Sequence, residues 1–530
     1  MNDVLGPVMT GPSSSHTAAP GKIGQSVAQL WGQPVQSAAV TYDSQGSYPN
    51  THVGQGSDFG FAGGLLGLTL DDPNVRDSIQ LAKSLGVEIR FQVEPLSGSH
   101  PNEAKLEIFQ QGSRQAVMSV LSFSTGGGTF RLVELDGFPI DFDGQRKKYF
   151  LACDRTAEGS ISQILGRAKA QFLVRYPVPA AVTAGTTPPC SVLFEIEAGS
   201  LQGEALSNLE KEREHLRYLR WAGPVVPVPL RLQPQAPFST ASGALEYAAQ
   251  QGIVTMPQLA LAYEEGLGEL TREAAYKKME QVLVAMRQSM APPPKDDPVP
   301  NLLIPRKAEE IGSRTNMPID MGVINTCMKH AMAVMENGCA HRVVVAAPTA
   351  GSSGVIPASV VGVGQTMGCT AKQILDALWA SGLVGAFIAN QATFGAEVAG
   401  CQAEIGAAAC MAAAGVVQLM GGSIQEGFHA SCIAMQSLMG LICDPVAGLV
   451  EIPCIERNVT ASAMVIMAAN MALCGVQSPI SLDETIQTMM EVGKALPPSL
   501  RCTCQGGLCV TKTGQEMLAR VQALQGGRSK

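Results

Sequence analysis

Three cysteines in the second half of the chain have the residue type and the surroundings of metal ligands. Cys401 lies in GAEVAGCQAEIG, and Cys443 and Cys454 lie at the two ends of CDPVAGLVEIPC. The Pro and Gly residues of this second segment predict an irregular loop between helices, which can aim thiolates and amide N–H groups at one point. Spacing alone leaves another interpretation open, because most free cysteines are small buried hydrophobic residues and there is no zinc-type or ferredoxin-type C-x-x-C run.

The tail carries a second group of thiols, in LRCTCQGGLC. Cys502 and Cys504 form a tight C-x-C, and Cys509 follows the two glycines. Such a group is an alternative site for a soft metal.

Charged residues accompany the first group of thiols. Asp444, Glu456 and Arg457 lie in CDPVAGLVEIPCIERN, and Glu404 follows Cys401 by about one helical turn. Charges are costly to bury unless they are paired or functional, so we expect either a role in a site or a salt bridge among the first three.

A serine-rich segment near the start, GPSSSHTAAPGK, gathers hydroxyls, amide donors and one imidazole between Gly-Pro and Pro-Gly. Such a loop can bind a carboxylate or a phosphate. A turn that only caps a helix is an equally good interpretation. The candidate binding residues are Ser13, Ser14, Ser15 and Thr17, with His16 as a candidate acid or base.

A second anion-binding candidate lies in HRVVVAAPTAGSSGVIPASV. The β-branched run ends at Pro348, and Pro357 can open a helix. A strand-to-helix turn of this composition presents N–H groups and a helix N-terminus to an anion such as an amino-acid carboxylate. Its candidate residues are Thr349, Ser352, Ser353 and Gly354.

Composition narrows the classes of partner. The chain has 530 residues, a formal net charge of −8 and a pI of about 5.5, so it offers no basic field to nucleic acid or to an anionic membrane surface. The uncharged stretch 458–482 contains too many polar residues for a membrane span and reads as a helix buried in protein. The first residues lack the pattern of a secretory signal, which predicts a cytoplasmic protein with a small-molecule ligand.

The pattern along the chain predicts α+β N-terminal domains followed by a mostly α-helical catalytic domain. Residues 1–147 mix short β-like runs with a Gly-rich segment. Residues 148–230 read as strand, helix, strand, a charged helix over 205–219 and a last strand over 225–232, an order that resembles an ACT domain. After a Pro-rich connector, residues 238–530 read as Ala-, Gly- and Met-rich helices.

Five segments in this order, GPSSSHT, AAPTAGSSGVIPA, GAEVAGCQAEIG, CDPVAGLVEIPCIERN and QGGL, resemble the iron–sulfur L-serine dehydratases. The resemblance spans nearly the whole chain, as a β domain followed by an α domain. It implies a 4Fe-4S cluster on Cys401, Cys443 and Cys454 and elimination of water from L-serine without PLP, giving pyruvate and ammonia. It also implies that substrate carboxylate is held by the Ser13–Thr17 and Thr349–Ser353 segments. A homodimer active in amino-acid catabolism and gluconeogenesis is expected.

One motif departs from this family. Many members carry Gly-His-Gly-Thr-Asp, whereas this chain reads Gly-Gln-Gly-Ser-Asp over residues 54–58. Glutamine cannot take up a proton as imidazole can, so His52 and His16 become the candidate bases. Gln55, Ser57 and Asp58 complete the candidate catalytic set.

The departure keeps two other functions open: a related elimination or dehydration of another small hydroxy- or amino acid, and an amino-acid-sensing cluster protein with little catalysis. The tail differs as well, since some family members end in a cysteine that reaches the cluster. Here one of Cys502, Cys504 and Cys509 is the candidate fourth ligand. The absence of a Ser-x-Lys-x-x-Gly segment argues against PLP.

Overall fold

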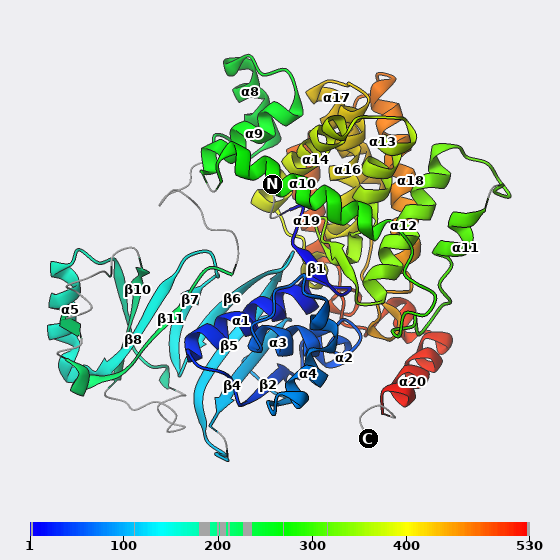
Figure 1. The fold of residues 1–530 in the computed structure, drawn as a ribbon. Helices are drawn as coiled ribbons and strands as arrows, with labels where there is room; N and C mark the ends of the chain where they lie inside the picture. Colours follow the sequence, from blue (N-terminus) through cyan, green and yellow to red (C-terminus); the bar gives the residue numbers. More distant parts are fainter. Residues whose placement is uncertain are drawn as a thin grey trace.

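The computed structural model describes residues 1, 4–110, 112–179, 191–198, 201, 208–209, 212–225, 236–268, 270–314 and 316–526. The amino-terminal part is built around two β-sheets, and the carboxyl-terminal part is a bundle of helices beside them (Figure 1). The predicted fold class is therefore confirmed.

The larger sheet has the strand order β3-β2-β4-β5-β6-β7, in which only β2 and β3 run parallel. One face is covered by helices α1, α3 and α4 (Figure 1). Strand β5 alternates buried and part-exposed residues, as expected for a sheet with one face against a core. The elements are β2 (Ser37–Asp43), β3 (Glu88–Glu94), β4 (Glu103–Phe109), β5 (Ala116–Gly126), β6 (Thr129–Leu135), β7 (Phe138–Phe142), α1 (Ala19–Trp31), α3 (Ser57–Leu65) and α4 (Ser78–Ser84).

Glycines let α1 and α3 pack backbone to backbone. A Cβ atom on Gly64 would lie 2.1 Å from the carbonyl oxygen of Gly21, and one on Gly60 would lie 2.5 Å from that of Thr17. A Cβ atom cannot approach backbone so closely, so these positions need glycine. The contact holds the serine-rich segment before α1 next to the Gln-Gly-Ser-Asp segment that begins α3.

The smaller sheet has the order β11-β8-β10-β9 with all neighbours antiparallel, and α5 (Glu158–Arg167) packs on it. Its strands are β8 (Lys148–Asp154), β9 (Phe172–Arg175), β10 (Ser191–Glu197) and β11 (Leu216–Ala222). The charged helix predicted over 205–219 is wrong at its end, because Leu216 onward belongs to β11, whose burial alternates with the period of a strand. The start of that segment and the strand predicted over 225–232 lie largely outside the described residues.

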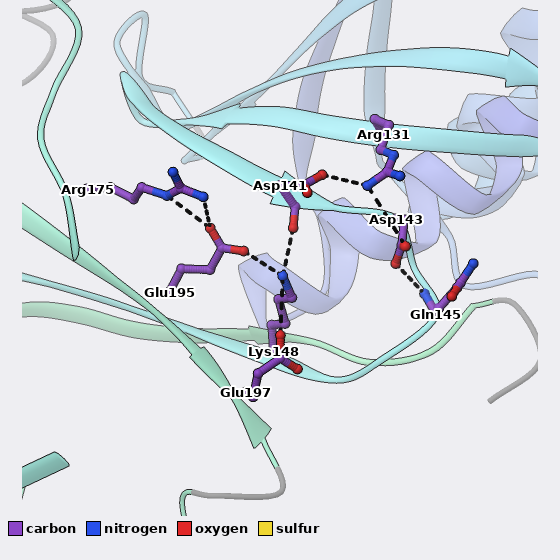
Figure 2. Close-up of polar contacts among 8 residues, drawn as sticks. All are labelled: Arg131, Asp141, Asp143, Gln145, Lys148, Arg175, Glu195 and Glu197. Atoms are coloured by element: carbon purple, nitrogen blue, oxygen red, sulfur yellow. Dashed lines mark hydrogen bonds and ion pairs between the residues drawn. The ribbon is translucent and has the colours of Figure 1, made fainter. Parts of the chain in front are cut away.

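A network of ion pairs and hydrogen bonds joins the two sheets (Figure 2). Lys148 Nζ lies 2.6 Å from Glu195 Oε1 in the small sheet and donates to the carbonyl oxygen of Asp141 on β7 at 2.9 Å. Arg175 makes a second ion pair with Glu195, at 3.1 Å. Because Glu195 is buried, both cations are held by a carboxylate that cannot exchange them for water.

The helical part surrounds α16 (Ile405–Leu419), which is apolar on all sides and nearly all buried, as expected for the centre of a large core. Two helical stretches, 371–391 and 401–419, are long and apolar enough to cross a membrane, yet 78% and 89% of their most apolar windows are buried inside the protein. The other helices are α8 (Ala241–Gln251), α9 (Met256–Leu267), α10 (Arg272–Ser289), α11 (Ala308–Ser313), α12 (Val323–Cys339), α13 (Val363–Thr366), α14 (Ala371–Gln391), α15 (Ala396–Ala399), α17 (Ile424–Ser437), α18 (Cys454–Leu473), α19 (Leu482–Ala495) and α20 (Lys512–Gly526).

A short two-stranded sheet brings together the two segments that were predicted to bind an anion. Strand β1 (Val8–Thr10) runs antiparallel to β12 (Val343–Val345), with Val8 opposite Val345. The serine-rich segment follows β1 directly, and the Thr-Ala-Gly-Ser-Ser-Gly segment follows β12. This pairing therefore places segments more than 300 residues apart in the sequence at one junction between the sheet and the helices.

Candidate active site

The predicted thiols meet where the helical part faces the large sheet. Cys401 begins a short 3-10 helix, Cys454 begins α18, and Cys443 lies in the loop before it. The Sγ atoms of Cys401 and Cys443 and a carboxylate oxygen of Glu404 lie within 4.8 Å of one another. Cys401 also raises the pKa of Cys454, so the third thiol lies close to the same point. This donor set is compatible with a metal centre.

Two of these thiols, Cys443 and Cys454, have pKa values raised by their surroundings, so they stay protonated in the absence of a cation. Contacts with the thiols of Cys401 and Cys502, together with burial, raise the pKa of Cys443 well above its usual range. Burial, Cys401 and Glu404 do the same to the pKa of Cys454. Cys443 and Cys454, both buried and without a disulfide partner, become thiolates most readily beside a positive centre, which is the chemistry of a thiophilic metal or cluster.

Asn458 locks the second anion-binding candidate onto the cysteine-bearing helix. Its side-chain oxygen accepts from the Gly354 N–H at 3.0 Å, and its nitrogen donates to the carbonyl oxygens of Gly351 and Cys454, each at 2.8 Å. The loop therefore cannot move independently of α18. The neighbouring Arg457 forms an ion pair with Asp444 at 2.9 Å, the simpler of the two roles expected for these charges.

The loop itself has the predicted strand–turn–helix form. Thr349 caps a 3-10 turn over Ala350–Ser352, and its hydroxyl lies 3.0 Å from that of Ser352. The Thr349 side chain also hydrogen-bonds Glu404, whose pKa burial raises to about 7. Ser353 faces away, toward Met335. Of the candidate residues in this loop, Thr349 is thus the one in contact with a carboxylate beside the thiols.

The serine-rich segment forms a buried π-helical turn over Ser14–Ala18, with Ser13 as its N-cap. The Ser13 hydroxyl accepts from the His16 N–H at 3.1 Å, so the capping interpretation is correct for this residue. Thr17 donates to the carbonyl oxygen of Gln55 at 2.6 Å. The turn is thereby tied to the segment with the altered motif.

His16 is held between two hydroxyls. Its Nδ1 lies 2.8 Å from Ser15 Oγ and its Nε2 lies 3.0 Å from Ser47 Oγ, which in turn donates to Asn102. Burial, with a smaller effect of His52, lowers the pKa of His16 to about 3. His16 is therefore a neutral imidazole near pH 7, fixed in orientation and poorly suited to take up a proton.

His52, unlike the buried His16, contacts a carboxylate and is partly exposed. Its Nδ1 lies 2.7 Å from Asp58 Oδ1, and the same oxygen accepts from the Tyr42 hydroxyl at 2.8 Å. The imidazole is part-exposed and lines a cavity of about 250 Å³ with Cys504 and Cys509. A histidine oriented by a carboxylate and open to a cavity has the arrangement of a general base.

The Gly-Gln-Gly-Ser-Asp segment, which departs from the family motif, contacts the cysteine-rich tail. Nε2 of Gln55 lies 3.8 Å from Sγ of Cys502, and the Cys502 N–H donates to the carbonyl oxygen of Cys443 at 2.9 Å. Cys504 and Cys509 instead contact the carbonyl oxygen of Pro445. Among the described tail cysteines, Cys502 is the one whose thiol touches a predicted cluster ligand. The Ser57 hydroxyl is buried and has no hydrogen-bond partner within the part of the chain that the structure describes.

Sequence reasoning missed three buried polar residues beside this junction, Tyr48, Asn102 and Glu397. The Tyr48 hydroxyl and Glu397 Oε1 have no hydrogen-bond partner among the described residues, and the Asn102 side chain contacts the Glu397 carboxylate. Glu397 shares a segment with Cys401, which was a usable signal. Tyr48 begins the short helix Tyr48–Thr51 and Asn102 lies just before β4, and neither segment gave a signal.

The comparisons with known proteins match this chain to one family. Residues 206–509 match the family model described as serine dehydratase alpha chain. The probable L-serine dehydratase, alpha chain, of Bacillus subtilis is 38% identical over 208 residues, which cover 39% of this chain and 69% of that protein. The L-serine dehydratase, alpha chain, of Peptoniphilus asaccharolyticus is 40% identical over 190 residues, 36% of this chain and 65% of that protein.

A longer relative is matched over less of its length. The L-serine dehydratase TdcG of Escherichia coli is 42% identical over 217 residues, so the match spans 39% of this chain and about half, 48%, of that protein. Because the family model covers more than half of the 530 residues, the chain belongs to the serine dehydratase alpha chain family.

Proposed function

We propose that this protein is an L-serine ammonia-lyase that eliminates water from L-serine without PLP, giving pyruvate and ammonia. The observation that carries the proposal is the meeting of two buried thiols, Cys401 and Cys443, with the Glu404 carboxylate and the Thr349 loop. It gains support from the relatives described above, which are named as L-serine dehydratases.

Cys401, Cys443 and Cys454 would hold a 4Fe-4S cluster. Bound by three cysteines, such a cluster supplies a Lewis acid for the β-hydroxyl of the substrate. The protein contributes a largely dry site, because all three thiols are buried in the junction and Glu404 beside them is part-buried. Exclusion of water strengthens every polar contact made there.

The substrate carboxylate would lie between the serine-rich turn and the Thr349 loop, held by Ser13, Ser14, Ser15 and Thr17 on one side and by Thr349 and Ser352 on the other. The Ser353 hydroxyl faces Met335 and the Gly354 N–H donates to Asn458, so these two residues would shape the loop rather than bind the carboxylate. The first segment carries its hydroxyls on a buried turn next to His16, and the second is fixed to α18 through Asn458. Each segment directly follows one strand of the β1–β12 pair, so the pairing of these strands fixes the distance between the two segments.

His52 would accept the Cα proton, with Asp58 holding its other ring nitrogen. As that proton leaves, the Cβ–O bond breaks and the hydroxyl departs as water after protonation. The resulting enamine tautomerises and hydrolyses in water to pyruvate and ammonium. His16, fixed between Ser15 and Ser47, would orient the serine-rich turn. Gln55 and Ser57 would line the site without exchanging protons.

A second candidate rests on Gln55, which replaces the imidazole of the family motif: a related elimination on another small hydroxy- or amino acid. An amino-acid-sensing cluster protein with little catalysis is the third. The division into residues 1–147, an ACT-like unit over 148–230 and a catalytic unit over 238–530 belongs to the proposal. So do a cytoplasmic homodimer and a role in amino-acid catabolism and gluconeogenesis.

The test is anaerobic reconstitution with iron and sulfide, followed by measurement of pyruvate formed from L-serine. Pyruvate formation that is lost on exposure to air is the expected result. A brown protein that leaves L-serine unchanged but dehydrates another small hydroxy-acid would favour the second candidate, and one that binds L-serine without turnover would favour the third.

A further inference from the structure

Buried polar side chains converge at the junction from three segments. Tyr48 comes from the short helix Tyr48–Thr51, Asn102 from the loop before β4, and Glu397 from α15 of the helical part. All three side chains are at least nine-tenths buried. The Tyr48 hydroxyl and Glu397 Oε1 have no hydrogen-bond partner among the described residues, and the Asn102 side chain contacts the Glu397 carboxylate. Such atoms cost free energy unless a ligand or water satisfies them, so their convergence from both parts of the molecule indicates a binding site.

Glu397 lies between the two groups of candidate site residues. On one side, the Asn102 side chain contacts it, and Asn102 is held by Ser47, which also bonds His16. On the other side lies Glu404, whose carboxylate is 4.0 Å from Sγ of Cys401. A molecule bound between the serine-rich turn and the thiols would therefore touch Glu397.

The site selects a cation. Burial raises the pKa of Glu397 to about 7, and Glu404 adds to this effect, while the backbone N–H of Glu397 and the Asn102 side chain oppose it. Among the described residues, Glu397 forms no ion pair. A carboxylate in this position repels an anion and gains most from a compact donor of positive charge, such as an ammonium group.

The Tyr48 hydroxyl provides a second hydrogen-bond acceptor next to the Glu397 carboxylate. Its ring lies edge-on to His16, with the ring centroids 5.0 Å apart. Burial and Glu397 raise the pKa of its hydroxyl, so that hydroxyl stays neutral and its oxygen can accept a hydrogen bond. An –NH₃⁺ group has three protons to donate, and Glu397 with Tyr48 offers acceptors for them.

We infer that Glu397, with the Tyr48 hydroxyl beside it and Asn102 as its positioning residue, binds the α-ammonium group of the amino-acid substrate. The inference rests on the proposed function for the identity of that substrate. This contact gives the substrate a third point of attachment to the protein, in addition to its carboxylate and its β-hydroxyl. Three separate attachments around Cα distinguish an amino acid from a hydroxy acid and one enantiomer from the other.

The test compares two ligands that cannot undergo the elimination because both lack a β-hydroxyl. L-Alanine carries the ammonium group, and L-lactate carries a hydroxyl in its place. Calorimetry on the anaerobically reconstituted holoenzyme should show L-alanine bound at least about 10-fold more tightly than L-lactate. Glu397→Gln should reduce this ratio to near one, while the affinity for L-lactate changes less than about 3-fold.

Two variants guard against indirect effects. Glu336→Gln also removes a buried carboxyl, which lies on α12 and accepts hydrogen bonds from the backbone N–H groups of Lys307 and Ala308 at the start of α11. It should leave the alanine-to-lactate ratio unchanged. Tyr48→Phe keeps the carboxylate and should lower the ratio by a smaller factor, about 3-fold. Iron content and visible spectrum confirm that each variant retains the cluster.

The outcomes separate this inference from the proposed function. Loss of pyruvate formation in Glu397→Gln with an unchanged ratio would overturn the inference, because Glu397 would then act in proton transfer. A wild-type ratio near one would overturn it as well. A wild-type protein that discriminates the two ligands through Glu397 but forms no pyruvate from L-serine would support the inference and contradict the proposed function.

Discussion

Gln55 of the large sheet's helical layer reaches Cys502 of the tail, with Nε2 3.8 Å from Sγ. The same cysteine pairs through its backbone with Cys443, and its thiol contacts that of Cys443. The glutamine that replaces the family imidazole thus contacts a cysteine at the predicted cluster site. The two departures from the family pattern are neighbours in space.

This contact leads to a prediction about Cys502. A tail thiol beside the cluster ligands competes with substrate for the same place, so we expect Cys502→Ser to lower the KM for L-serine by at least about 3-fold. Steady-state kinetics on the reconstituted enzyme measure this. Cys474→Ser is the control, because its thiol is exposed and lies outside this contact, and it should leave KM unchanged. An unchanged KM in Cys502→Ser would mean that the tail does not compete.

The thiol assignment predicts loss of the cofactor. Cys443→Ser and Cys454→Ser should each lose the brown colour, most of the bound iron and all turnover, because an alcohol is a poor replacement for a thiolate ligand. Iron and acid-labile sulfide analysis checks this. Cys474→Ser changes an exposed thiol on the same part of the molecule and should retain both iron and activity. A colourless Cys443 variant with full activity would remove the cluster from the proposal.

Several features of the fold and of the candidate site could be predicted from the sequence. The fold class followed from patterns along the chain, and the Thr349 turn formed as its composition indicated. The meeting of Cys401 with Cys443 was implied by the family resemblance, because their spacing alone left the interpretation as buried cysteines open. Glu404 was noticed from its spacing to Cys401.

Other features depend on contacts between distant segments. Tyr48 and Asn102 reach the site because sheet pairing and the packing of α1 on α3 bring their segments there, and no local pattern encodes that. The end of the segment predicted as a helix became β11 because pairing with β8 outweighed local propensity. The choice between His16 and His52 required their burial and partners, which spacing does not contain.

We expect His52, rather than His16, to act as the catalytic base. His52→Ala should lower kcat by at least about 100-fold with iron content unchanged, because it removes the proposed base. Asp58→Asn should lower kcat by a smaller factor, since the imidazole remains but loses the carboxylate that orients it. Rapid-quench or steady-state pyruvate assays measure both. Near-normal turnover in His52→Ala would move the role of the base elsewhere, with His16 next to be tested.

The buried carboxyl of Glu397 should also be visible in the stability of the metal-free protein. Its pKa in the folded state, about 7, lies above the ordinary value of 4.5, so the folded state holds this proton more tightly than the unfolded state does. The favourable contribution is complete below about pH 4.5 and is lost as the pH rises through about 7. Glu397→Gln removes this titration, so the Tm of the variant should rise relative to wild type between pH 5 and pH 8. Thermal scans of the apoprotein at both pH values, with Glu336→Gln as a buried-carboxyl comparison, measure the difference. A Tm difference that stays constant across this range would mean that Glu397 is already ionised in the folded apoprotein.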